Sequence, residues 1–361
     1  MKKEDKEMNI VSKSDNRELT YILLSQILGC FLVILGHSYP FITDMPYYVD
    51  HSRGYIYTFH MPLFVWCSGF LYAYTGQSSR KNFSTYVGQR ARKLLIPYFV
   101  LSLIGIFPKY FFSSLLNDSL ALDAESIFRA FLVPRENIWG HFWFLPMIFF
   151  LGCISFFIDK SITKSGFSRK TVWIIIFAIF LALEFCADTS KYLLWFGVND
   201  ILRFGWSFAL GVLVYLLFGD ILGKLKSDGW QSCIVGGGIF AFTLAVYYTY
   251  IDIDGIYKRV LYMMIAVLMI YALLMLCAKW SESTNINRKS IVAQTYQIFI
   301  LSWPCQLVVG IIIERILHLQ WWVFIPFVFI SGVFGPMIII KIVDWFENKT
   351  KTKILSYILG R

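Results

Sequence analysis

The chain has 361 residues, of which 57 % are hydrophobic, 19 % are aromatic and only 16 % are charged. A soluble domain carries about 25 % charged residues because water must wet its surface, so this composition excludes an ordinary soluble protein. The net charge of +10 is also found in nucleic-acid-binding proteins, but those need a basic face. Here the basic residues fall in short segments between apolar runs, and we expect no nucleic-acid partner.

Ten apolar runs are each close to the roughly 20 residues that a helix needs to cross a bilayer. The sequence therefore predicts an all-α integral membrane protein, with the lipid bilayer as its main partner. The predicted spans are residues 21–42, 55–76, 94–113, 139–158, 171–187, 201–218, 230–251, 259–278, 292–313 and 321–343. We divide the chain into a disordered cytoplasmic tail (1–20), a ten-helix membrane domain (21–343) and a basic cytoplasmic tail (344–361).

The distribution of Lys and Arg predicts the orientation, because cytoplasmic connections are enriched in both. Most of the 33 Lys and Arg residues belong to one side, which holds both termini and every second connection. That side includes residues 80–93, 160–170 and 279–289. We therefore expect a multi-pass protein of the cell membrane with both termini in the cytoplasm.

Three histidines are candidate catalytic residues, because a titratable side chain within a membrane span is costly and marks a functional site by default. His37, His60 and His141 all fall at the outer ends of predicted spans. Histidine suits acid–base catalysis near neutral pH, although each could also be a plain hydrogen-bonded residue. No Asp or Glu lies among them at ligand spacing, and the seven cysteines show no CxxC pattern, so we predict no metal site and no disulfide framework.

The segment QRARKLLIPYF, which enters the third span from the cytoplasm, is the second candidate site. Arg90 and Lys93 are three residues apart and share a helix face, and Arg92 lies beside them. Such a cluster can bind phosphates, with Arg as a bidentate fork and Lys as a point charge. The alternative is that these residues only anchor the helix at the cytoplasmic surface.

Two further features are expected to be structural. Arg203, just inside the sixth span, has Asp200 one turn away as its expected ion-pair partner. Pro304 is expected to kink the ninth span and to free backbone carbonyls, which Gln297 or Gln306 would serve.

The order of these segments resembles the acyltransferase 3 family of membrane proteins, whose best-known bacterial members O-acetylate surface polysaccharides. The resemblance extends over nearly all of residues 20–343. The matching segments are LLSQILGCFLVILGHSYP, IYTFHMPLFVWCSGFLYAY, QRARKLLIPYF, HFWFLPMIFF and TYQIFILSWPCQ.

This resemblance implies a ten-helix fold that takes acyl-CoA, acetyl-CoA in particular, from the cytoplasm and acylates a sugar at the outer face. His37 matches the catalytic His of the family's first span. Arg90 and Lys93 match its Arg-x-x-Arg donor motif, with Lys in the second place.

The chain also departs from the family pattern at two positions. Relatives usually carry Arg eleven residues before the catalytic His, where this chain has Gln26. Gln26 and His37 share a helix face about 16 Å apart, whereas Arg17 falls on the opposite face and cannot replace the missing Arg. Many relatives also place a second His where this chain has Trp303.

These observations predict a membrane O-acyltransferase of a cell-surface glycan or its lipid-linked precursor. His37 is the expected general base, and His60 or His141 would orient it or take a second proton-transfer role. One alternative is a transporter or flippase for a glycan or organic acid. Another is a family member without catalysis that assists glycan assembly, and association with other assembly proteins or with a second copy stays open.

Cysteine labelling tests the predicted orientation. In a cysteine-free background, a single cysteine at Asp123 should react with an impermeant reagent in intact cells, because this residue is predicted to lie outside. A single cysteine at Ser165 should react only after lysis. Labelling of both positions from outside would contradict the orientation.

Overall fold

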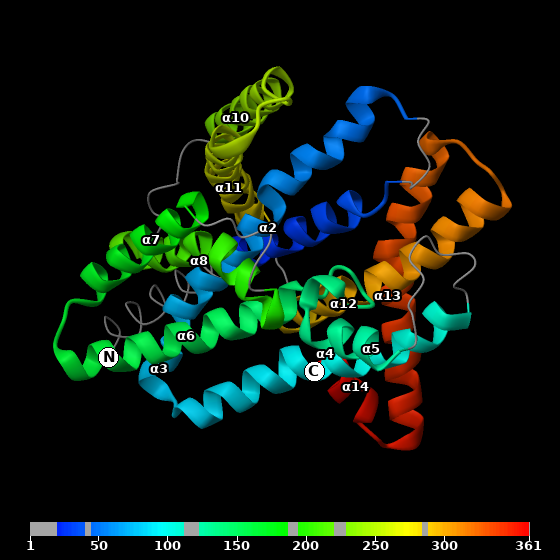
Figure 1. The fold of residues 1–361 in the computed structure, drawn as a ribbon, viewed down its shortest axis with the longest axis horizontal. Coiled ribbons are helices and arrows are strands. Elements are labelled where there is room, and N and C mark those ends of the chain that lie inside the picture. The colour runs from blue at the N-terminus through cyan, green and yellow to red at the C-terminus, as the bar shows by residue number, and fades with distance from the viewer. Residues whose placement is uncertain are drawn as a thin grey trace, which may run out of the picture.

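The computed structural model describes residues 20–39, 45–111, 123–186, 194–219, 229–283 and 288–360, and every regular element within these ranges is a helix. The predicted tail 1–20 lies almost entirely outside them. The helices, in chain order, are a first helix (Thr20–Gly36), α2 (Tyr47–Thr75), α3 (Gln77–Arg80), α4 (Phe83–Phe111), α5 (Ala124–Leu132), η2 (Pro134–Glu136), α6 (Phe144–Ser165), α7 (Arg169–Cys186), η3 (Trp195–Gly197), α8 (Val198–Phe218), α10 (Gly229–Thr249), α11 (Gly255–Ser283), α12 (Arg288–Ile311), the π-helical turn η4 (Ile312–Ile316), α13 (Trp321–Thr350) and α14 (Ile354–Ile358) (Figure 1).

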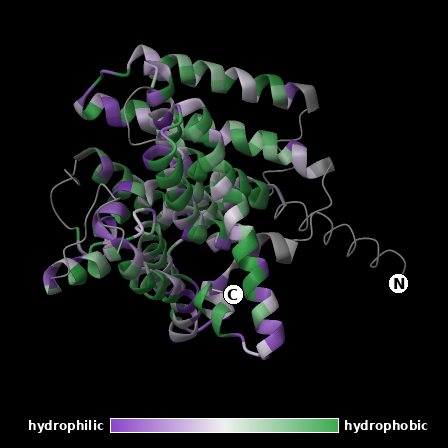
Figure 2. Ribbon diagram, turned by 90° about the vertical axis from the view of Figure 1, so that its right-hand side faces the viewer, coloured by the Kyte–Doolittle hydropathy of each residue, from purple (hydrophilic) through white to green (hydrophobic). Residues whose placement is uncertain are grey.

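A long helix occupies each of the ten predicted spans, which confirms an all-α membrane protein. Seven of the described helices, rather than ten, are long and apolar enough by length and composition alone to cross a bilayer. The first helix, Thr20–Gly36, is apolar but is not among the seven because its 17 residues are too few. α7 carries Arg169, Lys170 and Glu184 within 18 residues, and α2 carries six tyrosines among its 29 residues. Figure 2 shows apolar residues along the helices, with hydrophilic residues concentrated at helix ends and connections.

α2 and α8 cross in backbone contact because each carries a glycine at the crossing. A Cβ on Gly69 would lie 2.0 Å from the Phe208 carbonyl oxygen, and a Cβ on Gly211 would lie 2.2 Å from that of Trp66. Small residues permit such approaches between membrane helices, whose association cannot rely on the hydrophobic effect. The Ser207 hydroxyl adds a hydrogen bond to a carbonyl of α2, at 2.7 Å.

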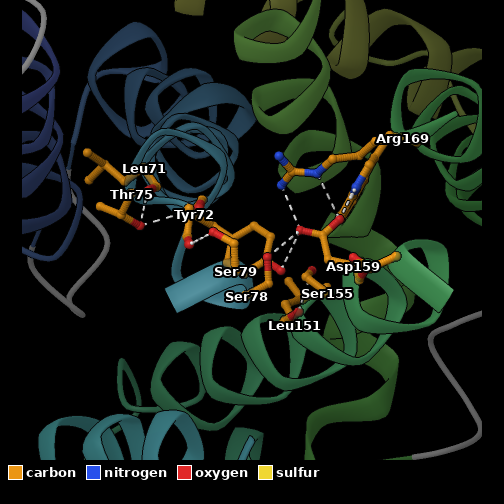
Figure 3. Close-up of polar contacts among 12 residues, drawn as sticks. Leu71, Tyr72, Thr75, Ser78, Ser79, Leu151, Ser155, Asp159 and Arg169 are labelled. Atoms are coloured by element: carbon orange, nitrogen blue, oxygen red, sulfur yellow. Dashed lines mark hydrogen bonds and ion pairs between the residues drawn. The ribbon is translucent and has the colours of Figure 1, made fainter. Parts of the chain in front are cut away.

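A buried carboxylate joins the ends of α2, α3, α6 and α7 (Figure 3). Asp159 is 4 % exposed and accepts five hydrogen bonds. The Arg169 guanidinium donates two of them, at 2.9 and 2.6 Å. The Trp173 indole, the Tyr72 hydroxyl and the Ser78 hydroxyl donate the others, at 3.0, 2.8 and 3.1 Å. Because this carboxylate is fully hydrogen-bonded and paired, its charge is compensated despite its burial.

The expected ion pair between Asp200 and Arg203 is wrong. Asp200 instead pairs with Arg135, whose Nη2 lies 2.6 Å from its carboxylate. The Arg135 guanidinium also lies 3.6 Å from the centre of the Trp143 ring. The sequence offered a partner one helical turn away, but the fold brings a better-placed cation from the turn η2.

Replacing Asp159 by Asn should destabilise the protein, because the substitution leaves Arg169 without its counterion and removes a charged acceptor from three other donors. Breaking a buried pair costs about 3–5 kcal/mol, and we expect the low end because the Arg169 side chain is 33 % exposed. Thermal unfolding of the purified protein in detergent measures the effect. Asp252→Asn, in the exposed turn between α10 and α11, is the matched control, and equal unfolding temperatures for the two variants would contradict the prediction.

Candidate active site

His37 lies directly after the last residue of the first helix, where its backbone N–H still bonds to Val33 at 3.0 Å. The preceding glycine makes room for Tyr57 of α2. A Cβ on Gly36 would lie 2.5 Å from the Tyr57 ring, and the Tyr57 hydroxyl donates to the Gly36 carbonyl at 2.9 Å. The Tyr57 ring is thereby held against His37, with ring centroids 6.0 Å apart.

Rings from three segments meet at His37. The edge-on Trp303 ring of α12 has its centroid 4.8 Å from that of His37. The His141 ring, from the turn before α6, is 6.3 Å from His37 and 6.4 Å from Trp303. Thus His37 and His141, about a hundred residues apart in the sequence, lie in ring contact.

His141 is buried, with 4 % exposure, beside the backbone of α12. Neither of its ring nitrogens makes a hydrogen bond of normal geometry with a described residue, although the ring lies next to the Phe299 and Ile300 carbonyls. Pro304 has no N–H to bond the carbonyl four residues earlier, which is that of Ile300. His141 therefore lies between the α12 backbone at this proline and the ring of His37.

Gln306 fixes the end of the first helix. Its amide nitrogen donates to the Ile34 carbonyl at 2.8 Å and to the Ser38 hydroxyl at 2.9 Å, the residues that flank His37 in space. Gly332 of α13 makes room for this side chain, since a Cβ there would lie 2.7 Å from Gln306 Cγ. The prediction that Gln306 serves a carbonyl freed by Pro304 is therefore wrong, because its amide crosses to another helix.

His60 contacts this cluster through the ring of Tyr57. Its ring is 5.1 Å from that of Tyr57, whose ring also contacts that of His37. Its Nδ1 is bonded to the Ile56 carbonyl, one turn earlier in α2, at 2.8 Å. The geometry thus favours His141 over His60 as the direct neighbour of His37, and the catalytic role of each stays a prediction.

Arg90 points from α4 toward α6. Its Nη2 donates to the Ile148 carbonyl at 2.9 Å, and its guanidinium lies 5.6 Å from the Tyr86 ring centre. A Cβ on Gly152 would lie 2.7 Å from Arg90 Nε, so this glycine lets the guanidinium pass close to α6.

The two neighbouring cations lie against other tyrosines. The Arg92 guanidinium is 4.3 Å from the ring centre of Tyr357 in α14, and the Lys93 ammonium is 5.6 Å from that of Tyr296 in α12. The three cations, which we call the basic cluster, therefore fan out from α4 toward three different helices.

No carboxylate within the described ranges pairs with the basic cluster. Three other arginines in the same ranges do form ion pairs, namely Arg129 with Glu136, Arg135 with Asp200 and Arg169 with Asp159. Tyrosine faces attract a cation without neutralising it. The basic cluster consequently keeps its positive charge available for an anion.

α6 links the two sites. His141 lies three residues before its first residue, whereas Ile148 and Gly152, which contact Arg90, are its fifth and ninth residues. At 1.5 Å per residue, the Arg90 contacts lie about 6–12 Å along the helix axis from the first residue of α6. A histidine site and a cation site are therefore stacked along one helix. The described residues contain no group of three or more His, Cys, Asp or Glu that could hold a metal ion.

The model of the acyltransferase 3 family, described as an acyltransferase domain, matches residues 19–341. The chain belongs to this family. Nodulation protein NolL of Mesorhizobium japonicum is 31 % identical over 228 residues, which cover 62 % of this chain and 52 % of that protein. NolL of Sinorhizobium fredii is 39 % identical over 88 residues, 23 % of each chain. The chain thus matches about half the length of the first relative, and no solved structure matches.

The chain is thus a multi-pass membrane protein of the acyltransferase 3 family, as its family match and its helices indicate. Its two departures from the family pattern occupy defined places. Gln26 lies on the first helix, three turns before His37, and Trp303 is the ring nearest to His37. Arg17 is outside the described residues.

Sequence reasoning missed several residues of both sites, namely Tyr57, Tyr86, Tyr296, Gln306 and Tyr357. A tyrosine in a membrane protein is expected first at the bilayer interface, so composition gave no reason to select these. One signal was present: Pro97 lacks the N–H that would bond the Lys93 carbonyl, four residues earlier. This carbonyl therefore needs a hydrogen-bond donor from another helix.

Proposed function

We propose that this acyltransferase transfers an acetyl group from acetyl-CoA to a hydroxyl of a cell-surface glycan, or of its lipid-linked precursor, in the cell membrane. The observation that supports it most is the stacking of two sites along α6. An uncompensated basic cluster suits the phosphates of the donor, and the pair His37–His141 suits proton transfer at its thioester.

The reaction needs a base because a sugar hydroxyl is a weak nucleophile. In its neutral form, the imidazole of His37 takes the hydroxyl proton as the oxygen bonds to the acyl carbon. The carbon–sulfur bond then breaks, and the departing thiolate receives the proton from the imidazolium. His141, whose ring centroid lies 6.3 Å from that of His37, is placed to assist the second transfer.

The rings around His37 restrict it in two ways. Trp303 and Tyr57 both pack against the imidazole, and Gln306 fixes the backbone at the end of the helix that carries it. A base held in one orientation loses little entropy when the reacting atoms meet. The same arrangement gives a physical use for Trp303 at a position where many relatives carry His.

The substitution His37→Gln separates an acyltransferase from a transporter. It keeps polarity and much of the volume but removes the titratable nitrogen, and the loss of a positioned general base costs about 10² to 10⁴ in rate. We expect expression, insertion and glycan export to persist while glycan acetylation, measured by NMR of the isolated glycan, disappears. His37→Ala should behave alike.

His51→Gln is the matched control, since His51 bonds to the backbone of Tyr47 away from this cluster. It should acetylate normally. Normal acetylation by His37→Gln would remove His37 from the role of base, and loss of glycan export would favour the transporter.

Donor binding depends in this proposal on the charge of the basic cluster. Charge-assisted hydrogen bonds are worth about 1.5–3 kcal/mol each, so the double variant Arg90→Gln, Lys93→Gln should weaken coenzyme A binding at least tenfold. Titration of coenzyme A into the purified protein in detergent measures the dissociation constant. The control is Arg80→Gln, Lys81→Gln, which removes the same charges from the end of α3, and equal affinities for both double variants would show that the cluster only anchors α4.

A further inference from the structure

The chain reverses direction after α13 and returns to the part of α4 that carries the basic cluster. Lys351 adopts a left-handed backbone conformation with φ +55° at the end of α13, and α14 then packs beside the middle of α4 (Figure 1, red). Glu347 of α13 accepts hydrogen bonds from the backbone N–H of Ser356, at 2.7 Å, and from its hydroxyl. We call residues 351–360 the C-terminal strap.

The C-terminal strap is a packed part of the fold. Leu359 is 5 % exposed and joins the main hydrophobic core. Gly360 has φ +72°, and a Cβ there would lie 2.7 Å from the Lys93 carbonyl oxygen. Glycine is the residue that adopts this conformation at no steric cost, and its lack of a side chain lets the strap touch the backbone of the basic cluster.

The strap approaches α4 at the Lys93 carbonyl, which Pro97 leaves without its usual helical hydrogen bond. Proline at position 97 provides no N–H for the carbonyl four residues earlier, and the hydroxyl of Tyr296 donates to it instead, at 2.7 Å. The Lys93 ammonium lies over the ring of the same tyrosine. A Cβ on Gly360 would also lie 3.0 Å from the Tyr296 ring and 3.3 Å from Pro97 Cγ. Strap, proline and tyrosine therefore form one support beneath Lys93.

Tyr357 of the strap supports the second cation. The Arg92 guanidinium lies over its ring, 4.3 Å from the ring centre. A ring face attracts a guanidinium without taking up its N–H donors as a carboxylate would. An exposed arginine has large rotamer freedom, which binding must otherwise restrict. No carboxylate among the described residues competes for these donors.

Building on the donor site proposed above, we propose that the C-terminal strap is a wall of that site and that Tyr357 is a positioning residue. It holds Arg92 with its N–H edge toward the phosphates of the coenzyme A donor. The strap therefore orders the site and does not occlude it.

Steady-state kinetics of the purified full chain with acetyl-CoA test this proposal. A cation–π contact at an exposed site is worth about a twofold to fivefold change in affinity. Tyr357→Ala should raise the KM for acetyl-CoA by that factor, with kcat and the KM of the acceptor unchanged. Tyr357→Phe, which keeps the ring, should restore the KM. Tyr257→Ala, a 71 % exposed tyrosine of α11, is the matched control and should leave the KM unchanged.

A double-mutant cycle shows whether Tyr357 acts through Arg92. In an Arg92→Gln background, Tyr357→Ala should have no further effect on the KM. A stability loss with unchanged KM, additive effects of the two substitutions, or a lowered KM for acetyl-CoA would each overturn the proposal. If Arg90→Gln, Lys93→Gln lowers donor affinity while Tyr357→Ala does not, only the strap's role fails. If neither affects donor affinity, the donor site itself fails.

Discussion

The backbone contact between α2 and α8 is the constraint on which the placement of the site depends. Lipid tails are as apolar as the helices, so α2 gains no hydrophobic energy by leaving lipid for protein, and close packing must supply the attraction. The glycines Gly69 and Gly211 allow that packing, each receiving a carbonyl of the other helix where a side chain would stand. α2 in turn carries Tyr57 and His60. A wider crossing would withdraw Tyr57 from Gly36 and thus from His37.

Two prolines act in the same way at the two sites. Pro97 in α4 and Pro304 in α12 each leave a carbonyl without its intrahelical N–H, a cost that membrane helices tolerate only where other groups take up the freed acceptor. Tyr296 takes up the Lys93 carbonyl, and His141 lies beside the Ile300 carbonyl. At each proline, the missing helical hydrogen bond thus brings a side chain of another segment next to a residue of a candidate site. α12 contributes to both sites, through Tyr296 to the basic cluster and through Trp303 to His37.

How far the sequence predicts this protein depends on the range of each interaction. Length and hydropathy are local, so the helices and the family followed from the sequence, and the joint position of His37 and His141 followed from their similar predicted depth. Pairings across the fold did not. Asp200 was assigned to Arg203, the nearest cation along the helix, but the loop cation Arg135 binds it. Residues 344–361 looked like a basic tail, because the five residues of α14 are too few to show a helical period.

The distribution of carboxylates explains why the basic cluster rests on tyrosines. A carboxylate beside Arg92 would orient it firmly but would also cancel its positive charge, and the phosphates of the proposed donor would have to compete with it. A tyrosine face orients the guanidinium through its quadrupole and leaves the net charge intact. Elsewhere in the described chain the need is the reverse: Asp159 and Asp200 are buried and require full compensation, so arginines are paired with them. Arginines paired with acids therefore hold the fold, whereas Arg90 and Arg92 lie against tyrosines and have no carboxylate partner among the described residues.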